Sequence, residues 1–222
     1  MRRNGPLLWR VQVPQLSKNY IDMRQKIIGS NSGYSILAYE NALIFYVYGR
    51  VTLNTDSFLW LLPSVFYFFH HAIEVSIKTL LRLKDVAYPD SGYAGHRIYS
   101  LLRIAIKNNI FPKDIDDKLQ QEELVELLKV MDGSYLKNKY AYPGYDLGGV
   151  HLIDIVDEII FALFEEINLI LKLKIPKHAP ANIYVPEPVE KIFLHNLKKP
   201  FPYTVGGLRD KLSTIDLPRE KN

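Results

Sequence analysis

The chain has 222 residues, of which 48% are apolar and 23% charged; these proportions are typical of a folded globular protein and exclude disorder and collagen-like repeats. It contains no cysteine, which excludes disulfide scaffolds, thiolate zinc sites, iron–sulfur clusters and cysteine nucleophiles. The formal net charge is +4, which by itself does not indicate a function.

The N-terminal region predicts two helices. Ser17 is of a residue type that caps helices, and Gly29 ends the helical pattern after Ile28. Residues 34–50 form a second candidate helix that is apolar nearly all round, so we expect it to be deeply buried. The N-terminal sequence lacks the long apolar run of a signal peptide, and we expect a cytoplasmic protein.

The strongest helical pattern follows Asn54–Asp56, which offers cap chemistry. Pro63 should kink this third helix or mark its first turn. The most apolar stretch, residues 58–69, is too short to span a bilayer, so we expect no membrane association. From Ser64 onward, apolar residues recur every three or four positions, as in Val65, Phe68, Phe69, Ala72, Ile73, Ile77, Leu80 and Leu81.

Three further helices are predicted along the rest of the body. The loop Tyr88–Gly92 precedes a pattern over His96–Lys107, and a second pattern covers Asp114–Lys139. A break at Tyr142–Gly144 leads to a long amphipathic pattern over Val150–Leu173. No segment alternates in the manner of a strand, so the sequence predicts an all-α, up-and-down helical bundle.

The C-terminal region differs in composition and charge from the body. We therefore divide the chain into a helical domain, residues 1–174, and a basic extension, residues 175–222. Six prolines between Pro176 and Pro202 interrupt the extension, which we expect to be an irregular arm with one short helix near Pro188–Leu197. Residues 172–222 carry a net charge of +5, which suits either a solvated tail or contact with phosphate or an acidic partner.

Three segments in the middle of the chain occur in a familiar order. They are FHHAIEVSIKTLLRL at residues 69–83, GHRIYSLLRIA at 95–105 and LVELLKVMDGSYLKNKYAYPGY at 124–145. This order resembles the HEPN family of helical nucleotide-binding domains, over about residues 64–172. The positions that carry the resemblance are Glu74, Lys78, Gly95, His96, Tyr135, Lys139, Tyr140, Tyr142 and Pro143, with Lys139 in place of the usual Arg.

The resemblance implies a bundle of four or five helices that is often a homodimer. It also implies RNA cleavage, nucleotide binding, or a place in toxin–antitoxin and defence systems. The family's ribonucleases carry an Arg shortly before a His, and no Arg in this chain has that spacing. We therefore expect a binding protein without catalysis or cofactor, which recognises RNA, a nucleotide or a nucleotidyltransferase-type protein.

Six side chains are the candidate ligand-binding residues. They combine cations and aromatic rings that can hold phosphate and stack on bases, and they are Glu74, Lys78, His96, Tyr135, Lys139 and Tyr142. Each also has a structural interpretation: the first two can form an i, i+4 ion pair, His96 can fix a loop, and the tyrosines can pack a corner. A functional site requires that they gather in one place.

The alternative function is a divergent, metal-independent ribonuclease. In that case His96 or His151 would move the proton of the attacking hydroxyl. Arg97 or Lys139 would steady the phosphate charge.

Metal binding is a further possibility, but we expect no metal. One helical set comprises His70, His71 and Glu74, and a second comprises His151, Asp154 and Glu158. Both suit a divalent ion in a bundle, but the Glu–x–x–His pattern of di-iron bundles does not occur in the sequence.

Overall fold

The computed structural model describes residues 33–55, 58–110, 116–117, 119–138, 153–173, 185–186 and 192, with the backbone alone at 58–60 and 134–138. Its main elements are α2 (Gly33–Leu53), α3 (Phe58–Leu83), α4 (Gly92–Gly95), α5 (Ile98–Lys107), α7 (Glu122–Asn138) and α8 (Ile153–Leu171). No strand occurs in these ranges, and the prediction of an all-α bundle is confirmed. None of the described helices is long and apolar enough to cross a membrane.

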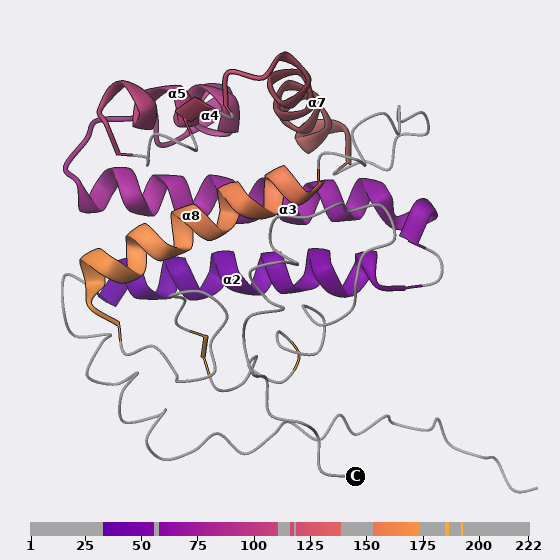
Figure 1. The fold of residues 1–222 in the computed structure, drawn as a ribbon, viewed down its shortest axis with the longest axis horizontal. Helices are drawn as coiled ribbons and strands as arrows, with labels where there is room; N and C mark the ends of the chain where they lie inside the picture. The colour runs from indigo at the N-terminus through magenta and orange to yellow at the C-terminus, as the bar shows by residue number, and fades with distance from the viewer. Residues whose placement is uncertain are drawn as a thin grey trace, which may run out of the picture.

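Helix α3 is the central element of the bundle. It contacts α2, α5, α7 and α8. Figure 1 shows α2 and α3 side by side, with α8 crossing them obliquely and α4, α5 and α7 on the other side of α3. This arrangement explains why the apolar stripe predicted from Ser64 onward is so continuous, since several neighbours must be packed against it.

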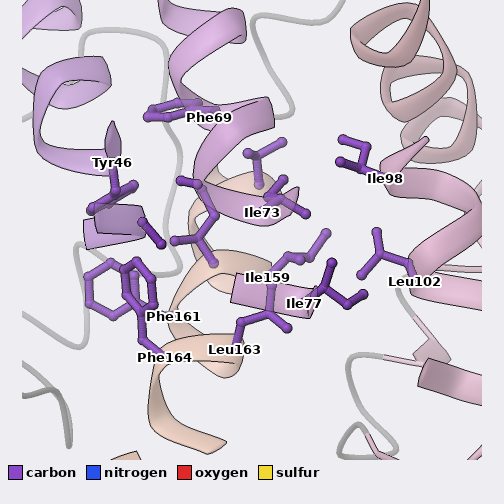
Figure 2. Packing of buried hydrophobic residues seen from close by; sticks show 14 of the residues in the cluster. Tyr46, Phe69, Ile73, Ile77, Ile98, Leu102, Ile159, Phe161, Leu163 and Phe164 are labelled. Carbon is purple, nitrogen blue, oxygen red and sulfur yellow. The ribbon is translucent and has the colours of Figure 1, made fainter. Parts of the chain in front are cut away.

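The core forms where α2, α3, α5 and α8 meet. In Figure 2, Phe69 and Ile73 of α3 lie between Tyr46 of α2 and Ile98 of α5. The Tyr46 and Phe69 rings are stacked with their centroids 5.6 Å apart. Close approach of α2 and α3 requires a glycine at position 49, because an added Cβ would lie 2.4 Å from the Phe69 ring.

The burial predicted for the helix at residues 34–50 is largely confirmed. Most of α2 is buried or half-buried. The exposed positions, Tyr34, Asn41 and Tyr48, are seven residues apart and form one narrow outer stripe.

Three predicted helix boundaries differ from the structure. Of the two roles predicted for Pro63, marking the first turn is wrong, because the helix already begins at Phe58 and Pro63 lies inside it. The pattern assigned to Asp114–Lys139 is broken by a turn at residues 119–120, and α7 begins at Glu122. Acidic residues in the first turn of α7 favour that start, because they interact well with the positive end of the helix dipole.

The third wrong boundary lies at His96, which precedes α5 instead of opening it. The backbone of Arg97 is extended, and α5 begins at Ile98. The reason for this start is a carboxylate from α7, described below.

Helices α3, α5 and α8 are each followed by a residue in the left-handed conformation. These residues are Asp85, Asn109 and Lys172, with φ between 51° and 55°. Asp and Asn tolerate this conformation better than most side chains, so the first two ends are partly encoded locally.

Two sequence predictions lie outside the described residues: the helix from Ser17 to Ile28 and most of the C-terminal arm. Three positions of the arm are described. Among them, Val185 is buried and joins the hydrophobic core.

A buried ion pair joins α2 to α8. Arg50 Nη1 donates a hydrogen bond to Asp157 Oδ2 at 2.8 Å, and the Tyr46 hydroxyl donates to Asp157 Oδ1 at 2.9 Å. Burial raises the pKa of Asp157 to about 6, although Arg50 and the hydrogen bond from Tyr46 act in the opposite direction. The cost of burying this carboxylate is therefore only partly offset by its partners.

We predict that Arg50→Met destabilises the fold by about 3 kcal/mol or more, because it leaves a buried carboxylate without its cation. Urea unfolding of the full chain measures this change. The double variant Arg50→Met/Asp157→Leu should recover much of the loss, since no uncompensated charge then remains. A double variant less stable than Arg50→Met would contradict this account.

Candidate functional site

Glu74 is the centre of a polar network on α3. Its side chain is 5% exposed, and its Oε1 accepts a hydrogen bond from Lys78 Nζ at 3.0 Å. The same oxygen lies 3.0 Å from His96 Nδ1, which acts as the donor because a carboxylate can only accept. Three of the six predicted ligand-binding residues therefore meet at one carboxylate.

The loop between α3 and α5 brings His96 to this position. Lys78 Nζ also donates to the backbone carbonyl of Asp90 at 3.0 Å, which ties the loop to α3. Gly95 is buried beside Asp90, where an added Cβ would lie 2.9 Å from the backbone carbon. Gly95 therefore allows the loop to pack closely, and the next residue, His96, makes the hydrogen bond to Glu74.

Asp132 of α7 is the residue that sequence reasoning missed. Its Oδ1 accepts from the backbone amide of Ile98 at 2.6 Å, so this carboxylate caps the first turn of α5. His70 Nε2 lies 3.2 Å from the same oxygen. The signal was present in the sequence, because Asp132 follows Leu128 by four residues on the apolar stripe of its helix.

The second oxygen of Glu74 faces two histidines. Its Oε2 lies 3.8 Å from the Nδ1 atoms of both His70 and His71. His70 is fully buried, whereas the His71 side chain is 20% exposed. The sequence pattern of these three residues therefore corresponds to a real cluster in the fold.

The environment of Glu74 keeps its carboxyl group ionised. Burial alone would raise its pKa, but the neighbouring His71 imidazole, the hydrogen bond from Lys78 and the charges of Lys78 and His70 lower it to about 2. The negative charge is therefore a fixed part of the network at neutral pH.

A basic surface, formed by the exposed side chains of Arg103 and Lys107, lies on α5. Residues 91–113 contain no Asp or Glu but four Lys or Arg, a signal that sequence reasoning also missed. Arg103 and Lys107 are exposed on the side of α5 opposite its buried residues. At the start of the helix, the Arg97 guanidinium lies over the ring of Tyr93, 5.6 Å from its centroid, and Tyr93 is 62% exposed.

The cavity beside α2 is not the place where the predicted site residues meet. That cavity has a volume of about 430 Å³ and is lined by Tyr34, Leu37, Ala38, Glu40, Asn41, Ile44 and Val75. Glu74, Lys78 and His96 are not among its lining residues. The three side chains meet in a network between helices, at the edge of which His96 is 37% exposed.

The remaining predicted residues cannot be placed in this network. Tyr135 is described by its helical backbone alone, and Lys139, Tyr142 and His151 lie outside the described residues. The second predicted metal set is therefore reduced to Asp154 and Glu158, which are half-buried on α8.

Comparisons with models of known families, with curated proteins and with solved structures find no match to this chain.

We predict that Glu74 stabilises the fold at neutral pH and loses this effect in acid. Its pKa is lowered on folding, so the contribution is present above the unfolded-state value, near 4.5, and disappears as the pH falls toward 2. The difference in unfolding free energy between the wild type and Glu74→Gln should therefore shrink by about 3 kcal/mol from pH 6 to pH 2.

Chemical unfolding at a series of pH values measures this difference. Glu126→Gln is the control, because Glu126 is an exposed carboxylate on α7 whose partner, Lys129, is also exposed. A pH dependence of Glu74→Gln equal to that of the wild type would contradict the prediction.

Proposed function

We propose that this chain is a HEPN-like helical binding protein that recognises the phosphate groups of RNA or a nucleotide through α4 and α5. The exposed cations Arg103 and Lys107 on α5, together with the Arg97–Tyr93 contact before its first residue, are the observation that carries the proposal. A nucleotidyltransferase-type partner in a toxin–antitoxin or defence setting is supported only by the sequence resemblance.

Charge supports this choice of surface. The stretch around α5 carries several cations with no carboxylate among them, so a phosphate backbone would meet no repulsion from the same segment. Arg103 and Lys107 are one turn apart and exposed, which allows both to reach successive phosphates of a single strand.

Aromatic side chains on the same segment supply the second element of such a site. The ring of Tyr93 is exposed and already has a guanidinium over one face. Lys129 Nζ lies 5.9 Å from the centroid of the half-buried Tyr99 ring. Stacking of bases on rings that lie between cations is the usual mode of single-strand binding without sequence preference.

The contact between His96 and Glu74 favours ribonuclease activity as a second candidate function. A buried carboxylate that holds Nδ1 of a partly exposed histidine is the arrangement that orients a general base. Such a base would take the proton of the 2′-hydroxyl, whose oxygen attacks phosphorus. The bond between phosphorus and the 5′ oxygen would break, and that oxygen would take a proton from water, which leaves a 2′,3′-cyclic phosphate and a 5′-hydroxyl end. Arg97 would offset the negative charge on the phosphate oxygens.

The binding proposal predicts salt-dependent affinity for single-stranded RNA that Arg103→Gln/Lys107→Gln weakens. Removal of two phosphate contacts should reduce the slope of log K against log salt by about 1.4. Fluorescence anisotropy with labelled RNAs of unrelated sequence measures both quantities for the full chain.

The control double variant is Lys84→Gln/Lys172→Asn, which removes the same charge from the ends of α3 and α8. Asn is chosen because Lys172 has φ of 51°, which Asn tolerates. Equal losses in both double variants would mean that net charge, not this surface, binds RNA. No binding by the wild type would overturn the proposal.

The ribonuclease candidate predicts cleavage in the presence of a chelator, which His96→Gln abolishes while RNA affinity is retained. Arg103→Gln/Lys107→Gln should instead raise KM with a smaller effect on kcat. Gel analysis of end-labelled RNA, with detection of the cyclic phosphate, separates the two effects. Absence of cleavage by the wild type would reject this candidate and leave the binding proposal intact.

A further inference from the structure

The cluster of His70, His71 and Glu74 has the chemistry and spacing of a metal site, and neither candidate function uses its two histidines. One ligand atom from each residue lies within 4.8 Å of the other two. Glu74 Oε2 is 3.8 Å from both Nδ1 atoms. Two ligands of a tetrahedral zinc ion at about 2.0–2.2 Å are about 3.4 Å apart, so each of these contacts would need to shorten by only a few tenths of an ångström.

Asp132 prepares His70 for this role. Its Oδ1 also accepts a hydrogen bond from the backbone amide of Ile98, and because a carboxylate oxygen only accepts, His70 Nε2 is the donor. In neutral His70 the lone pair is then on Nδ1, the nitrogen nearest Glu74 Oε2. A carboxylate that holds the far nitrogen of a histidine is the usual outer partner of a metal ligand.

The surroundings of His71 favour a site that is shielded but accessible. The Phe45 and Tyr67 rings lie 4.5 Å and 5.2 Å from the His71 ring, and they provide an apolar wall. The His71 side chain is 20% exposed, so the cluster has a side that reaches solvent. Three protein ligands would leave a coordination position for water.

We propose that His70 Nδ1, His71 Nδ1 and Glu74 Oε2 bind one divalent transition metal ion of the zinc class. Two imidazoles and one carboxylate suit Zn²⁺ or Fe²⁺ and are poor ligands for Ca²⁺ and Mg²⁺, which prefer oxygen. Lys78 Nζ donates a hydrogen bond to Glu74 Oε1, the other oxygen of the same carboxylate, and its positive charge repels the metal ion. This proposal does not depend on RNA binding or cleavage.

Titration of the full, tag-free chain with Zn²⁺ or Co²⁺ alone tests the proposal. Calorimetry should detect one equivalent of Zn²⁺, and Co²⁺ should develop the visible absorption of a site with few ligands. His71→Ala and Glu74→Gln should each weaken binding at least about tenfold. Lys78→Met should strengthen it, because the competing charge is removed, and a purely structural role would not produce that result.

Glu126→Gln is the matched control for Glu74→Gln, since it removes an exposed carboxylate of α7 that is paired with Lys129. It should leave the affinity unchanged. Folding of each variant is checked by far-UV circular dichroism, and binding to a folded protein should raise the Tm of the wild type but not that of His71→Ala. Failure of the wild type to bind one equivalent, or equal affinity in the wild type and His71→Ala, would overturn the proposal.

Discussion

Enclosure of α3 by other helices is the constraint on which the rest of the structure depends. A helix surrounded in this way must satisfy its polar side chains inside the protein, because water cannot do so. His70 and Glu74 are the two most consequential of these side chains, since each can carry charge. Their partners come from α3 itself, from α7 and from the loop before α5, so satisfying them also determines how these elements pack.

Asp132 shows how one buried carboxylate links packing to chemistry. It caps α5 and orients His70 at the same time, and therefore couples three helices through one side chain. Asp157 performs a similar task on the other side of α3, where it joins α2 to α8 through Arg50. The bundle is thus held together by apolar contacts and aligned by two buried acids, which restrict helix register in a way that apolar packing alone does not.

The polar network and the basic surface have opposite character. Glu74 is buried, ionised and surrounded by donors, whereas Arg103 and Lys107 are exposed on a segment without acids. His96 precedes α5 by two residues, with Nδ1 bonded to the buried carboxylate and part of its ring exposed. An anionic ligand that reached the N-terminal end of α5 would meet a histidine whose orientation is already set, which connects the binding proposal to the ribonuclease alternative.

The sequence by itself determined the helical class, because apolar residues at intervals of three and four are visible without any tertiary knowledge. It also indicated the contact between Glu74 and Lys78, since residues four apart on a helix share a face. Only the tertiary structure decided that His96 joins them and that Asp132 caps α5. Those contacts span 22 residues or more along the chain, and local periodicity holds no information about which distant helices meet.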